Sequence, residues 1–147
     1  MQNNSEISLD IPARFDQLEL LRNHIENIIQ TATPHLTAEE VHLLTYNTQL
    51  AVNEIGTNII EHAYAGMIDR DTARVIVRLC VLPSPLQLEI RMHDTGHSFE
   101  YDPTREPLFD TIPERGYGLF LARQLLDHIE YIPKPNANTW HLIKQLS

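Results

Sequence analysis

An acid and an amide lie four residues apart at Glu54 and Asn58, and His62 follows at the same spacing. Residues four apart lie one above the other on a helix, so these side chains are expected to form one polar column. An amide oxygen is a good neutral ligand for Mg²⁺, which takes few protein ligands together with phosphates and water. A carboxylate one turn earlier can accept a proton from an attacking hydroxyl. The alternative is an ordinary solvated helix face.

A second polar segment, Asp94 to Phe99, follows an apolar alternation that ends at Met92. A carboxylate at a strand end can accept a hydrogen bond from an exocyclic amine such as that of adenine. Gly96 would let the backbone approach a flat ring closely, and Phe99 would pack beneath the loop. Taken alone, Asp-Thr-Gly is equally an ordinary turn after a strand.

A third segment places Gly116 and Gly118 where a helical pattern begins, with Arg115 before them and Leu119 after them. Glycines expose backbone amides there, and a helix N-terminus favours phosphate. Arg115 has the reach to contact a terminal phosphate, but it could equally be a surface charge. Together the three segments indicate a pocket for a nucleotide and its metal ion.

Other metal and thiol candidates are weaker. His93 and His97 flank Asp94, but two histidines around a loop glycine, with no cysteine nearby, do not set the geometry of a zinc site. Cys80 is the single cysteine and sits in an apolar run, so a structural role is expected and no internal disulfide can form.

The composition restricts the class of protein. The 147 residues suit one domain, expected to span 1–147. A net charge of −9 without a Lys/Arg cluster argues against direct nucleic-acid binding. No apolar run of about 18 residues predicts a membrane span, and the polar start is unlike a signal peptide. We therefore expect a cytoplasmic location.

The periodicity predicts the elements that must position these motifs. Thr37 and Glu40 form a capping box that opens a long helix, with Gly66 as its stop signal. Clean alternation in two later strands predicts a sheet with one face covered and one wet, which argues against a doubly wound parallel sheet. The expected elements are a strand at 7–11, helices at 15–29 and 37–63, strands at 75–81 and 86–92, a lid at 97–115, a helix at 118–129, and strands at 130–132 and 140–146. This order predicts a two-layer α/β sandwich, a mixed, mostly antiparallel sheet with three helices on one face.

The motifs, in this order and context, resemble those of the GHKL ATPases and kinases, which have the Bergerat fold. The matching segments, which look like that family's N, G1 and G2 boxes, are Glu54-x-x-x-Asn58, Asp94-x-Gly96-x-x-Phe99 and Gly116-x-Gly118-Leu119. LAVNEIGTNIIEHAY, RGYGLFLARQLLDHIEY and NTWHLIKQL are similar to the bacterial anti-sigma-factor serine/threonine kinases. The resemblance extends from about Ile7 to Leu146.

The resemblance implies specific roles. Glu54 would be the base that activates the acceptor serine, Asn58 would ligate Mg²⁺ and Asp94 would recognise adenine, beneath an ATP lid at 100–115. The expected ATP-binding set is Asn58, His62, Asp94, Gly96, Phe99, Arg115, Gly116, Gly118 and Leu119. The resemblance also implies a homodimer that binds a sigma factor and phosphorylates an anti-sigma-factor antagonist of the STAS fold.

Three functions remain open from the sequence. The first is a protein-serine kinase that also sequesters a sigma factor, since phosphoryl transfer needs mainly positioning and charge neutralisation. The second is a switch module that binds ATP and holds its partner without significant transfer. The third is an α/β scaffold that binds no nucleotide.

Overall fold

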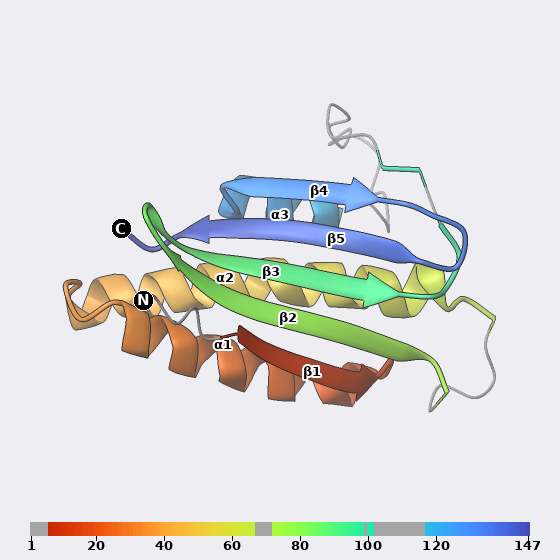
Figure 1. Cartoon of the computed structure of the whole chain (residues 1–147), viewed down its shortest axis with the longest axis horizontal. Coiled ribbons are helices and arrows are strands. Elements are labelled where there is room, and N and C mark those ends of the chain that lie inside the picture. The colour runs from red at the N-terminus through yellow and green to blue at the C-terminus, as the bar shows by residue number, and fades with distance from the viewer. Residues whose placement is uncertain (1–5, 67–71, 99, 102–116) are drawn as a thin grey trace.

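The computed structural model describes residues 6–66, 72–98, 100–101 and 117–147. It has a helical layer packed on one face of a sheet, as Figure 1 shows. The elements, in chain order, are β1 (Glu6–Pro12), the 3₁₀ turn η1 (Phe15–Gln17), α1 (Leu18–Ala32), α2 (Ala38–Asn58), the π-helical turn η2 (Ile59–Ala63), β2 (Arg74–Pro83), β3 (Leu86–Asp94), α3 (Tyr117–Leu125), β4 (His128–Ile132) and β5 (Asn138–Gln145). The two-layer fold expected from the sequence is confirmed.

The five strands form one sheet in the order β1-β2-β3-β5-β4, and each of these neighbouring pairs is antiparallel. The β3–β5 pairing places Asp94 opposite Asn138 and Met92 opposite Trp140. Alternate residues of β2 and β3 are buried, as the sequence pattern predicts. One sheet face therefore packs against the helices, while the other, here called the outer face, is turned away from them (Figure 1).

The long helix α2 begins at the predicted capping box. The Thr37 hydroxyl accepts from the Glu40 backbone N–H, and the Glu40 carboxylate accepts from the Thr37 N–H, both at 3.1 Å. Two orphan donors of the first helical turn are thereby satisfied. Gly56 lies against α1, where an added Cβ would come within 2.8 Å of Leu18 Cδ2. The glycine therefore allows the two helices to approach closely.

The core fills the space between the layers. Trp140 is fully buried and packs against Tyr131 with ring centroids 4.5 Å apart. Cys80 is half-buried in β2, and burial raises the pKa of its thiol, which fits a structural role.

No helix in the described part of the chain has both the length and the apolar character needed to cross a membrane.

Several element boundaries differ from the sequence prediction. The final helix was expected to reach residue 129, but α3 ends at Leu125 and β4 begins at His128. The apolar residues Leu125, Leu126 and Ile129 suit either period, and pairing of β4 with β5 decides the outcome. Phe15, expected as the first residue of the helix at 15–29, lies in the 3₁₀ turn before α1 and is 53% exposed.

Candidate functional site

The N-box helix carries an unpaired polar atom inside the protein. Asn58 is the last residue of α2, and its Oδ1 is buried with no hydrogen-bond partner among the described residues. Buried amide oxygens are normally satisfied, so an unpaired one needs an explanation such as an ion or water. An amide oxygen of this kind fits the expected role as a Mg²⁺ ligand. Glu54, one turn earlier, is half-buried on the same helix.

The helical geometry changes directly after Asn58. Residues Ile59–Ala63 form a π-helical turn, a local feature that is often found at functional sites. The wider turn alters the rotation between successive side chains. The four-residue spacing therefore relates Glu54 to Asn58 as predicted, but the column does not continue regularly to His62, which is half-buried in the π turn.

Gly118 brings the third motif to the first. It lies in the opening turn of α3, where a Cβ would overlap the Glu54 Oε2 atom. The absence of a side chain at residue 118 thus leaves the space that the Glu54 carboxylate occupies. A carboxylate and the N-terminus of a helix meet at this point, and the exposed N–H groups of such a terminus also suit phosphate. The following residue, Leu119, is half-buried and packs against the core.

Asp94 is buried at the end of β3. Only 3% of its surface is exposed, and its Oδ1 accepts hydrogen bonds from Asn138 Nδ2 at 2.9 Å and from the Gly96 N–H at 3.0 Å. Burial raises the pKa of the Asp94 carboxyl, and the two hydrogen bonds oppose this rise. Among the described residues the bonds to this carboxylate all reach Oδ1, so Oδ2 is left to accept from a ligand.

The loop after Asp94 is attached to the π turn. The His97 N–H donates to the Ala63 carbonyl at 2.7 Å, and a Cβ at Gly96 would overlap that same carbonyl. The Tyr64 hydroxyl accepts from the Thr95 N–H at 2.9 Å and donates to the Arg74 carbonyl at 2.6 Å. The close approach explains the glycine at position 96. It also fixes the position of the Asp94 loop relative to α2.

Asn138 is a site residue that the sequence did not reveal. It is fully buried at the start of β5, where its Nδ2 also donates to the Gly96 carbonyl at 3.1 Å and its Oδ1 accepts from Ser98 Oγ at 2.6 Å. A signal was present, because residue 138 is in phase with the buried Trp140 and Leu142. A polar residue at an inward position of a strand needs a polar partner.

Three expected site residues, Phe99, Arg115 and Gly116, lie outside the described residues, as does most of the expected lid. The described contacts therefore join Glu54 with Gly118. They also join Asp94 with Gly96, whose loop contacts Ala63 in the π turn η2.

A shallow pocket of about 170 Å³ also reaches Asp94, but from the other side of the sheet. Its lining includes Ile76, His93 and Thr139, whose side chains belong to the outer face. The residues lining it do not include Asn58 or Gly118. This pocket is therefore separate from the contact of Glu54 on α2 with Gly118 on α3.

Comparison with known proteins identifies the family. A model of the histidine kinase-like ATPase domain matches residues 11–144. The serine-protein kinase RsbW of Bacillus pumilus is 30% identical over 132 residues, which cover 84% of this chain and 76% of that protein. The anti-sigma F factor of Bacillus cereus is 30% identical over 148 residues, which cover 97% of this chain and 94% of that protein.

Solved structures support the same fold. The RsbU and RsbW domains of a Mycobacterium tuberculosis protein align with a TM-score of 0.64 at 13% identity, covering 96% of this chain and 32% of that one. A histidine kinase domain of a blue-light-activated kinase from Erythrobacter litoralis aligns with a TM-score of 0.54 at 20% identity, covering 99% of this chain and 65% of that one. At these identities the likeness concerns the fold alone.

Proposed function

The chain belongs to the histidine kinase-like ATPase domain family, among the anti-sigma-factor serine kinases, and we propose that it is a Mg²⁺- and ATP-dependent protein-serine kinase. Its substrate in this proposal is a serine of a STAS-domain anti-sigma-factor antagonist, and its second partner is a sigma factor. The chain would act in the cytoplasm as a homodimer. The observation that carries the proposal is the buried Oδ1 of Asn58, which has no hydrogen-bond partner in the described part of the chain and lies one turn from Glu54.

The proposed nucleotide site is built from the three motifs. Asn58 Oδ1 would hold Mg²⁺, and Asp94 Oδ2 would accept a hydrogen bond from the adenine amine. The backbone at Gly118, in the first turn of α3, would face the phosphates. A chain of net charge −9 repels a polyanion overall, so local neutralisation by the metal ion and the helix N-terminus is required.

The proposed chemistry assigns proton transfer to Glu54. Bound Mg-ATP supplies the phosphoryl group that is transferred to the partner's serine. The Glu54 carboxylate would accept the proton of that serine hydroxyl as the oxygen attacks. Close packing of Glu54 against the backbone at Gly118 supports this role, because it keeps the carboxylate beside the expected phosphate position. Phosphoryl transfer depends mostly on such positioning and on charge stabilisation.

The test is transfer of label from γ-labelled ATP to a purified STAS-domain partner in the presence of Mg²⁺. We expect the parent chain to label one serine of the partner, and Glu54→Gln to bind ATP normally while transfer falls by about 10²-fold or more, the usual contribution of a general base. Glu61→Gln is the matched control, since Glu61 is an exposed glutamate in the π turn η2.

The outcomes separate the remaining functions. Tight ATP binding with no labelled serine would favour the alternative, a switch module that holds its partner without transfer. Unchanged transfer by Glu54→Gln would show that the base is another group. A chain whose thermal stability does not respond to Mg-ATP or Mg-ADP would contradict both ATP-dependent functions.

A further inference from the structure

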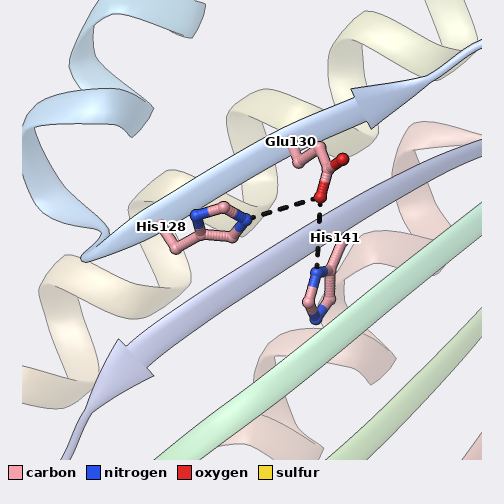
Figure 2. A group of neighbouring side chains, drawn as sticks. All are labelled: His128, Glu130 and His141. Atoms are coloured by element: carbon pink, nitrogen blue, oxygen red, sulfur yellow. Dashed lines mark ion pairs between the residues drawn. The ribbon is translucent and has the colours of Figure 1, made fainter.

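Three potential metal ligands lie together on the outer face of the sheet, which is turned away from the helices. Figure 2 shows His128 and Glu130 on β4 and His141 on the neighbouring strand β5, with their polar atoms turned toward one another. One ligand atom from each residue lies within 4.8 Å of the others. Glu130 Oε2 is 3.6 Å from His128 Nε2 and 3.9 Å from His141 Nδ1.

The strand geometry fixes this arrangement. His128 and Glu130 are two residues apart, so their side chains project from the same face of β4. Glu130 is paired directly with His141 across the β4–β5 ladder, and directly opposed residues bring their side chains close together. The cluster therefore depends on backbone pairing and not on a loop conformation.

A fourth residue sets the orientation of His141. The carboxylate of Glu89, on β3, has its Oε2 2.9 Å from His141 Nε2. A carboxylate only accepts hydrogen bonds, so Nε2 carries the proton and donates it, which leaves the lone pair of Nδ1 facing Glu130 and His128 when the ring is neutral. A carboxylate behind a histidine is the usual outer partner of a metal-binding imidazole, because it fixes the tautomer and increases ligand basicity.

We propose that His128 Nε2, Glu130 Oε2 and His141 Nδ1 form a zinc site, with Glu89 as the outer partner of His141. Two histidines and one carboxylate are an established ligand set for Zn²⁺, and the fourth position would hold water. Ligands at about 2.1 Å in tetrahedral geometry lie about 3.4 Å apart, so the observed separations need only small side-chain rotations. The sequence did not predict this site: the pair considered there for zinc, and set aside, was His93 and His97.

Charge at the cluster is consistent with a cation. Glu130 and Glu89 contribute two carboxylates, and the Arg91 side chain is directed to Glu89, with its Nε 3.5 Å from Oε1. His128 and Glu130 are about half exposed, so a zinc ion has direct access from solvent. The bound ion would connect the edge strand β4 to β5, and through Glu89 to β3.

The test is zinc titration of the tag-free chain, treated with a chelator and dialysed, in buffer without nucleotide. Calorimetry is expected to show one Zn²⁺ per chain, and bound Co²⁺ should give the visible absorption of a tetrahedral complex. His128→Ala and Glu130→Gln should each abolish the tetrahedral spectrum, because two protein ligands remain. Glu89→Gln should keep the spectrum and weaken zinc binding by about 10- to 100-fold, the usual effect of losing an outer partner.

His42→Ala is the matched control, since His42 is an exposed histidine on α2. This variant should bind zinc as the parent chain does, and zinc should raise the thermal midpoint of both but not that of His128→Ala. Zinc binding that is equal in the parent chain and in His128→Ala, or no binding by the parent chain, would overturn the proposal. Neither result depends on the proposed kinase activity, which is measured separately.

Discussion

Asn138 donates a buried hydrogen bond to Asp94, with 2.9 Å between Nδ2 and Oδ1. The two residues are directly paired across β3 and β5, and neither side chain has more than 3% of its surface exposed. Asn138 also contacts Gly96 and Ser98, so one amide holds three positions of the loop that was assigned to adenine recognition. Asn138 thus acts on the expected nucleotide site through Asp94.

Asn138→Ala should destabilise the chain and weaken nucleotide binding. The substitution removes one of the two hydrogen bonds to Asp94 Oδ1 and the Asn138 donor to the Gly96 carbonyl, and losing buried hydrogen bonds of this kind typically costs about 1–3 kcal/mol of unfolding free energy. Urea unfolding and ATP titration measure the two effects. Asn136→Gly is the control, since Asn136 is exposed and has a φ of 58°, a conformation that glycine adopts without strain. Equal stability of the two variants would show that the Asn138 network is dispensable.

The buried Asp94 carboxyl should make the free energy of unfolding depend on pH. Burial raises the pKa of Asp94 in the folded chain above its ordinary value of 3.8, so folding favours the protonated form. The stability contributed by Asp94 is therefore fully present below pH 3.8 and is lost as the pH rises through the folded pKa. Asp94→Asn keeps an oxygen that accepts from Asn138 and Gly96, so this variant should gain stability relative to the parent chain as the pH rises.

Urea unfolding of the parent chain and of Asp94→Asn at several pH values above 3.8 measures this difference. Asp16→Asn is the control, because it is the same substitution at an exposed position. The same Asp94→Asn variant should bind ATP at least about tenfold more weakly, since an amide donor would face the adenine amine. Normal ATP affinity would contradict the assignment of Asp94 to adenine.

Gly118→Ala should separate folding from the proposed transfer step. The new Cβ would displace the Glu54 carboxylate, whose flexible end can move, so the cost in packing is small. Alanine also favours the helix by about 0.5–1 kcal/mol over glycine, so we expect a net change in unfolding free energy within about 1 kcal/mol. Transfer to the STAS partner should fall at least tenfold. Gln124→Ala, exposed on the same helix, is the control, and transfer equal in both variants would contradict the proposed position of Glu54.

The sequence predicted most of the fold because its local signals agree with one another. The capping box at Thr37, the alternation in β2 and β3 and the turn at Gly66 each specify a boundary within a few residues. The secondary structure of the segment from Leu125 to Ile132 was harder to predict, because its apolar residues fit the periodicity of a helix as well as that of a strand. Only the antiparallel pairing of β4 with β5, which is a long-range contact, separates the two possibilities.

The site was predictable only where the chemistry is local in sequence. Glu54 and Asn58 are related by one helical turn, and the four-residue spacing was enough to predict that they lie one above the other on one helix. Asn138 and the His128–Glu130–His141 cluster are assembled by pairing between strands, so their spacing along the chain carries little information. The π turn after Asn58 was not predicted either, since the apolar residues Ile59 and Ala63 keep the four-residue spacing of a continued α-helix.

The role of Asn58 can be tested by comparing nucleotide binding with and without Mg²⁺. Its buried Oδ1 has no partner among the described residues, so Asn58→Ala removes an unsatisfied polar group as well as some packing contacts. Removing the unsatisfied amide stabilises the folded chain, whereas losing its packing contacts destabilises it. The unfolding free energy should therefore stay within about 1 kcal/mol of the parent value. The parent chain should bind ATP more tightly in Mg²⁺ than in a chelator, whereas Asn58→Ala should show little or no gain from the metal. Asn23→Ala, exposed on α1, should keep the full gain. A metal-dependent gain that survives in Asn58→Ala would place the magnesium ion on another residue, even if ATP binds at the same site.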